Sequence, residues 1–189
     1  MNIVRIINTH KPIWSTKEIL IITVILLIAF LMANHLYRKK MISCRQAIYG
    51  ILLLLYLITV LGSTVFTRVP GERKYQLELF WSWKEILHSA GRIGTMSQKS
   101  LFLQNILNMI LLFPAGIFLP QVFGCRIRWY RGLLFGILFS TGIELLQLLL
   151  CRGLFEFDDI IHNGFGCMAG TLLGNIIWQW QERRKKRMR

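Results

Sequence analysis

The sequence predicts an all-α membrane protein, a polytopic transmembrane helix bundle with about five spans in a single domain. Of its 189 residues, 54% are hydrophobic and only 17% are charged, and the mean hydropathy is +0.48. Five separate apolar runs are long enough to cross a bilayer, whose core of about 30 Å needs about 20 helical residues. This composition excludes a disordered chain and argues against an ordinary soluble domain.

The five predicted spans cover residues 18–37, 46–67, 101–120, 132–151 and 160–180. The first is longer than the apolar part of a signal peptide and is followed by RKK rather than a small-residue cleavage site, so we interpret it as a retained helix. The spans divide the chain into four regions: two N-terminal helices over 1–67, an extracytoplasmic aromatic loop over 68–100, a three-helix core over 101–180 and a basic tail over 181–189.

The lysines and arginines predict the orientation of the spans. Thirteen of the 23 fall in three short segments that the five spans place on one face, at 38–45, 126–131 and 183–189, and the others are spread along the opposite face. Because short cytoplasmic loops collect cations, we expect the N-terminus outside and the C-terminus inside. This arrangement accounts for most of the net charge of +14 without nucleic-acid binding, and the basic tail is expected to contact anionic lipid.

Aromatic residues and cysteines add two expectations. Tryptophans near both ends of the spans indicate aromatic belts at the two membrane interfaces: Trp14, Trp81 and Trp83 outside, and Trp129, Trp178 and Trp180 inside. Within 68–100, the segment YQLELFWSW predicts a short extended or interfacial stretch, either resting at the headgroups or forming a lid over a site. The four cysteines are far apart and support neither a disulfide framework nor a zinc site.

Polar residues inside the third and fourth spans predict a cluster near their outer ends. Asn108 and Glu144 each lie about seven residues from the outer end of their span, about 10 Å deep at 1.5 Å per residue, so they are expected to meet. The fourth span carries one polar stripe, formed by Ser140, Glu144, Gln147 and Cys151. A charge at this depth costs about 2 to 4 kcal/mol, so Glu144 needs a function or a structural partner, for which Asn108 and Arg152 are the candidates.

The fifth span adds acids at its start and a track of glycines. Asp159 and Asn163 share a helix face with the glycines, which lie four residues apart at Gly166, Gly170 and Gly174. Such a track lets another helix approach closely, and the fourth span, joined by a short loop, is the expected neighbour. Two structural alternatives remain here: Asp158 could cap the fifth helix, and Arg152 could be a cation at the membrane boundary.

Three stretches in order carry a resemblance to a known family: NMILLFPAGIFLP from Asn108, GIELLQ from Gly142, and RGLFEFDDIIHNGFGCMAG from Arg152. Together they resemble the VanZ-like family of bacterial membrane proteins, from about Arg68 to Gly174. The resemblance implies a multi-pass protein of the bacterial plasma membrane and cell envelope. The family prototype's association with raised teicoplanin resistance implies a role in resistance to this glycopeptide antibiotic, but it implies no reaction.

Two hypotheses describe what the polar cluster does. Its members are Asn108, Glu144, Gln147, Arg152, Asp158, Asp159 and Asn163. In the first hypothesis the protein is a non-catalytic factor, without cofactor or metal, that binds or alters access to an envelope lipid or a lipid-linked wall precursor. Ser140 and Cys151 have no histidine placed to activate them, and His162 is expected to be an interfacial hydrogen-bonding group.

In the second hypothesis the protein is a small intramembrane enzyme acting on a lipid-linked substrate. Glu144 and Asp159 are then the candidate catalytic residues, acting as acid and base or as ligands of Mg²⁺ or Ca²⁺, and Arg152 clamps an anionic headgroup. The sequence indicates neither the ligand nor the oligomeric state.

Overall fold

The computed structural model describes residues 16–88 and 96–188. Trp14 and part of the predicted aromatic loop lie outside the described residues. Five described helices are long and apolar enough to cross a membrane: α2 (Thr16–Arg38), α3 (Cys44–Leu61), α5 (Met96–Phe123), α6 (Trp129–Leu149) and α7 (Phe157–Arg187). The predicted bundle of five spans is therefore confirmed. Helix α7 continues through most of the predicted basic tail.

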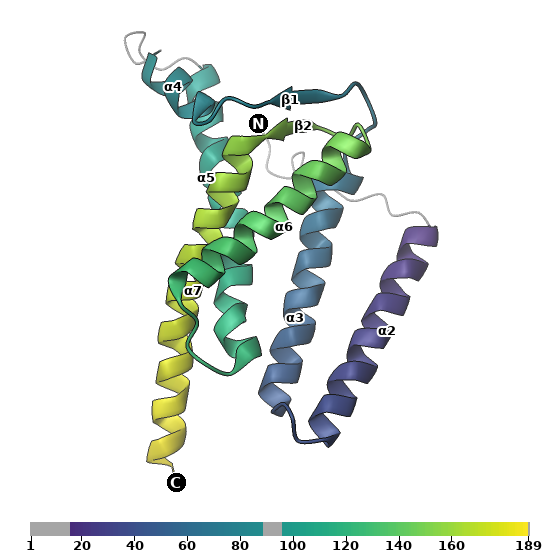
Figure 1. Cartoon of the computed structure of the whole chain (residues 1–189), viewed down its shortest axis with the longest axis vertical. Helices are drawn as coiled ribbons and strands as arrows, with labels where there is room; N and C mark the ends of the chain where they lie inside the picture. Colours follow the sequence, from purple (N-terminus) through teal and green to yellow (C-terminus); the bar gives the residue numbers. More distant parts are fainter. Residues whose placement is uncertain (1–15, 89–95, 189) are drawn as a thin grey trace.

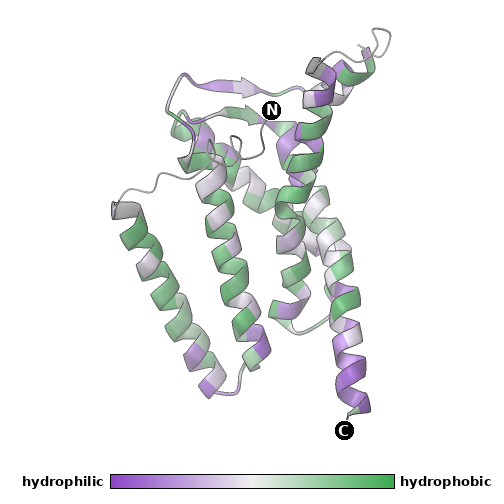
Figure 2. Cartoon of the chain, turned by 180° about the vertical axis from the view of Figure 1, so that it is seen from behind, coloured by the Kyte–Doolittle hydropathy of each residue, from purple (hydrophilic) through white to green (hydrophobic). Residues whose placement is uncertain are grey.

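The bundle has two chemically different ends. Figure 1 shows the α2–α3 turn, the α5–α6 loop and the end of α7 at one end, which we call the lower end. Strands β1 (Lys74–Gln76) and β2 (Leu154–Glu156) and helix α4 (Trp81–His88) lie at the opposite, upper end. Hydrophilic residues mark the lower ends of α2, α3 and α7 in Figure 2. The lysines and arginines that the structure describes in the three basic segments therefore lie at the same end of the bundle. That this end faces the cytoplasm remains a prediction.

Helices α5 and α7 touch along their backbones. A Cβ atom added to Gly166, Gly170 or Gly174 would overlap or crowd the backbone carbonyls of α5, at Met109, Phe113 and Ile117 respectively. The glycine track thus faces α5, and the expectation that it packs against α6 was wrong. The physical reason is that α6 brings small residues of its own, Gly132 and Gly136, which receive the Thr171 and Cys167 side chains on another part of the α7 surface.

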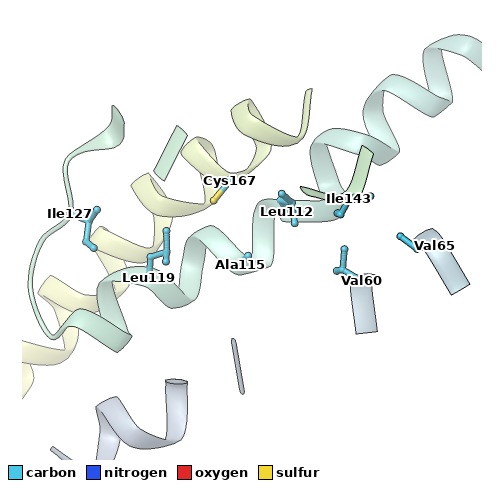
Figure 3. Packing of buried hydrophobic residues seen from close by; sticks show 8 residues of the cluster. All are labelled: Val60, Val65, Leu112, Ala115, Leu119, Ile127, Ile143 and Cys167. Atoms are coloured by element: carbon cyan, nitrogen blue, oxygen red, sulfur yellow. The ribbon is translucent and has the colours of Figure 1, made fainter. Parts of the chain in front are cut away.

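The buried apolar core follows α5. Figure 3 shows Leu112, Ala115 and Leu119 along this helix, with Cys167 reaching it from α7. Val60 of α3 and Val65 of the following π-helical turn η1 (Gly62–Phe66) complete one end of this core, which also includes Ile127 and Ile143. Much larger apolar surfaces remain exposed, above all on α2, where Leu20 is 65% exposed. Lipid can cover such surfaces, since lipid tails are as apolar as leucine.

The short strands tie two distant segments together at the upper end. β1 pairs with β2 in parallel, with Tyr75 opposite Phe155 and Gln76 opposite Glu156. The predicted extended stretch is therefore a strand only at its beginning, because Trp81 and Trp83 belong to α4. This pairing holds the segment after α3 beside the start of α7, where the acidic residues lie.

We expect Gly170→Ala to lower the free energy of unfolding by about 1–3 kcal/mol, because the added methyl group would force α7 away from the Phe113 carbonyl. Thermal unfolding in detergent checks this. Gly142→Ala is the control, since a Cβ at Gly142 has no heavy atom within 4 Å and alanine is the better helix former by about 1 kcal/mol. Equal losses in both variants would contradict the backbone contact.

Candidate functional site

The upper end of the bundle holds a layer of buried polar side chains. The layer draws on α5, α6, α7, β2 and α4, and its buried members are Ser82, Asn105, Ser140, Glu144, Gln147, Glu156, Asp158, His162 and Asn163. An unpaired buried polar group is costly, so the partners of each acid define how the layer is built. The strands and α4 bring donors that are far away in sequence.

Glu144 of α6 holds the junction between β2 and α7. Its Oε2 accepts a hydrogen bond from the backbone N–H of Glu156 at 3.1 Å. Glu156 is the residue that precedes the first turn of α7, so this bond fixes where α7 begins relative to α6. The partner is neither of the expected candidates, Asn108 and Arg152.

Asp159 of α7 is bonded to α5. The side-chain amide of Asn108 donates to its Oδ1. We expected Asn108 to meet Glu144, and this was wrong, because its partner is Asp159. The glycine contact brings α7, rather than α6, against this part of α5. Asn163, one turn further along α7, donates instead to the Ser140 hydroxyl of α6 at 2.8 Å.

Asp158 caps α4 rather than its own helix. Its carboxylate accepts from the backbone N–H of Phe80 and of Ser82, and from the Ser82 hydroxyl at 2.6 Å. The same hydroxyl accepts from the Asn105 amide at 3.1 Å. A carboxylate at a helix N-terminus satisfies free N–H groups and matches the positive end of the helix dipole. Asp158 therefore latches α4 onto the bundle.

Two tryptophans of α4 extend this latch. Trp81 donates its indole N–H to Glu156 Oε1 at 3.1 Å, and Trp83 donates to His162 Nε2 at 2.7 Å. Residues 74–88 therefore cover Glu156 and Asp158 through strand pairing and side-chain hydrogen bonds. Trp81 and Trp83 thus bond to buried side chains, which is more than resting at the lipid headgroups. His162 is buried and serves as an acceptor. Among the described residues, no hydrogen bond joins Ser140 or Cys151 to a histidine.

Two arginines at the edge of the layer contact Gln147, one through its side chain and the other through its backbone. The Arg68 guanidinium donates to Gln147 Oε1 at 3.4 Å, and the Gln147 amide donates to the Thr64 carbonyl at 3.2 Å. Arg152 donates its backbone N–H to the Gln147 carbonyl at 2.8 Å, and its guanidinium lies over the Phe66 ring at 5.7 Å. We expected the Arg152 guanidinium to lie beside Glu144. It makes this cation–π contact instead.

Glu156 lies just before the α7 span in an acidic environment. Burial raises its pKa above the usual range, and the charge of Asp158 acts in the same direction. The hydrogen bonds from Trp81 and Gln104 and the charge of Arg68 lower the pKa but do not outweigh burial.

Within the described residues, no group of three or more histidine, cysteine, aspartate and glutamate side chains is arranged to hold a metal ion.

Sequence reasoning left several members of this layer out of the predicted cluster. Asn105 carries a signal, since it lies one helical turn before Asn108. Arg68 carries a weaker signal as the first cation after the second span. Ser82 and Glu156 become members through tertiary contacts alone, because their partners lie 76 and 12 residues away.

The sequence model of the VanZ/LLP1 family matches residues 47–178. The chain belongs to the VanZ/LLP1 family. The match confirms the resemblance and extends it into α3, and it includes every residue of the predicted cluster. With its five apolar helices, this family member is a VanZ-like membrane protein. No curated protein and no solved structure matches the chain.

Asp158→Asn should loosen α4, because an amide cannot accept from both backbone N–H groups and the Ser82 hydroxyl. A loss of about 1–3 kcal/mol in local stability follows from leaving one donor unpaired. Hydrogen exchange at the amides of Phe80 and Ser82 measures it. Glu72→Gln, which removes an exposed acid from the same segment, is the control. Unchanged protection in Asp158→Asn would rule out the latch.

The raised pKa of Glu156 predicts a pH dependence of stability. The stabilisation is fully present below the unfolded-state pKa of about 4.3 and is lost as pH rises through the higher folded-state pKa. The melting temperature of the wild type relative to Glu156→Gln should therefore fall as the pH rises from about 4.3 towards neutrality and above. A difference in melting temperature that does not change with pH would show that the pKa of Glu156 is not raised in the folded protein.

Proposed function

We propose that this VanZ/LLP1 family member contributes to teicoplanin resistance in the bacterial plasma membrane by binding an envelope lipid or a lipid-linked wall precursor at its upper end. The observation that carries this proposal is a pair of arginines at the edge of the buried polar layer: Arg68, whose guanidinium contacts Gln147, and Arg152, whose backbone N–H contacts Gln147. The ion pairs of the described residues involve other cations, Arg45 and Lys84. Both guanidinium groups are therefore available to an anionic headgroup, with the charge of Arg68 also acting on Glu156.

The charge distribution supports placing this edge outside the cell. The cation-rich segments share the lower end of the bundle, and short cation-rich loops remain in the cytoplasm. The upper end then faces the compartment in which teicoplanin meets its wall-precursor target. A guanidinium forms strong, charge-assisted hydrogen bonds with phosphate, the group that joins lipid to headgroup.

The surface beside the arginines suits the lipid part of such a ligand. The end of α6 exposes Leu145, Leu149 and Leu150, of which Leu149 is 66% exposed. An acyl or polyprenyl chain can lie along this surface while the phosphate contacts Arg68 and Arg152. Binding of this kind needs no nucleophile.

One observation favours catalysis as a second candidate function. Glu144 and Asp159 come from neighbouring helices and are linked through the short Glu156–Asp159 segment. Two carboxylates in such an arrangement suit acid–base catalysis, or divalent-ion binding with Mg²⁺ or Ca²⁺. Glu144→Gln separates the two functions, because the amide oxygen still accepts from the Glu156 N–H but the side chain no longer exchanges a proton.

The test is teicoplanin susceptibility of a sensitive Gram-positive host carrying each variant at matched membrane levels. Wild type should raise the inhibitory concentration, and Arg68→Gln with Arg152→Gln should return it to that of the empty host. Arg73→Gln with Lys74→Gln is the matched control, since it removes two exposed cations from the same end and should retain protection.

Three outcomes decide between the functions. Glu144→Gln should retain most of the protection if the protein acts by binding, whereas its complete loss, in a variant that folds normally, would favour the enzyme. If the control double variant at Arg73 and Lys74 lost as much protection as the double variant at Arg68 and Arg152, a binding site beside Gln147 would be contradicted. Absence of protection by wild type would overturn the resistance role.

A further inference from the structure

The lower end of the bundle, opposite the polar layer, holds a second candidate binding site. A cavity of about 400 Å³ opens where the α5–α6 loop meets α7, lined by residues 126–130 together with Leu172 and Asn175. None of these residues belongs to the predicted cluster, and the cavity is also separate from the basic tail, which begins six residues beyond Asn175, its last lining residue.

A buried asparagine holds the loop that forms the cavity. Asn175 of α7 accepts from the Ile127 N–H at 2.9 Å and donates to the Ile127 carbonyl at 2.7 Å. Both residues are buried. This paired contact fixes the loop backbone against α7 at Ile127. Arg126 and Arg128 directly precede and follow Ile127, so their backbone positions are fixed as well. Asn175 is therefore a positioning residue for the two arginines.

The cavity is electropositive. The side chains of Arg126 and Arg128 are exposed, and the ion pairs of the described residues, Arg45–Glu182 and Lys84–Glu78, involve neither of them. Arg128 also donates to the Tyr130 hydroxyl at 3.3 Å, which orients its guanidinium along the cavity wall. The 21-residue helix α6 begins at Trp129 without a side-chain cap, and the positive end of its dipole adds to the attraction for an anion.

The remaining walls are aromatic and apolar. Trp129 and Tyr130 pack edge to face at 6.0 Å and are 54% and 40% exposed, while Leu172 of α7 is 48% exposed. Amphipathic rings beside cations are typical of the membrane–water interface. A ligand here meets two guanidinium groups at its head and apolar side chains along its tail.

We propose that this cavity binds the phosphate headgroup of an anionic phospholipid, with the acyl chains lying along the apolar surface beside Leu172. The site is independent of the function proposed for the upper end. It requires the arginines to be held by the loop, so it differs from diffuse attraction between a basic surface and the membrane.

Native mass spectrometry of the delipidated, full-length protein titrated with phosphatidylglycerol or phosphatidylcholine tests the proposal. Wild type should retain phosphatidylglycerol in preference to phosphatidylcholine. Arg126→Gln with Arg128→Gln should weaken phosphatidylglycerol binding about tenfold or more. Lys39→Gln with Lys40→Gln, which removes two exposed cations at the α2–α3 turn, should stay within about twofold of wild type.

Two further experiments distinguish a structured lipid-binding site from diffuse attraction to a basic surface and from a site for free phosphate. Asn175→Ala leaves both arginines in place and should weaken phosphatidylglycerol binding in a protein whose thermal unfolding remains cooperative. Inorganic phosphate should not displace the lipid. The proposal is overturned if both double variants lose binding equally, if the arginine double variant binds as wild type does, if Asn175→Ala folds and binds normally, or if inorganic phosphate displaces the lipid.

Discussion

The backbone contact between α5 and α7 is the constraint on which the upper end of this protein depends. In lipid there is no hydrophobic force to draw two apolar helices together, so they associate through close packing and hydrogen bonds. Glycines at 166, 170 and 174 remove the side chains that would separate α7 from the α5 carbonyls. The same alignment brings Asp159 beside Asn108, so that packing along the spans determines a polar contact at their end.

The buried acids of the upper end are satisfied mainly by neutral donors. Glu144 accepts from a backbone N–H, Asp159 from an amide, and Asp158 from two backbone N–H groups and a hydroxyl. The charge of Arg68 acts on Glu156, but within the described residues neither Arg68 nor Arg152 forms an ion pair with these acids. The upper end is therefore acidic inside and cationic at its edge, whereas the lower end is mainly cationic, with Glu182 paired to Arg45.

The extent to which the site could be predicted differs from residue to residue. Depth and helical periodicity place Asn108, Glu144, Asp159 and Asn163 at one end of the bundle, since both follow from the distance along a helix of known rise. Their pairing could not be read in this way, because it depends on which helices touch. Asp158 illustrates the difference: its position at the start of α7 predicts a cap, but the helix it caps is α4.

The sequence by itself determined that this protein is a five-span helical membrane protein of the VanZ/LLP1 family, because span length, apolar composition and ordered motifs are local properties of the chain. Only the tertiary structure decided that the glycine track faces α5, that residues 74–88 cover the acids, and that Arg68 rather than Arg152 bonds the Gln147 side chain. These contacts join segments whose relative rotation and tilt are set by packing between helices, and no local pattern encodes that packing.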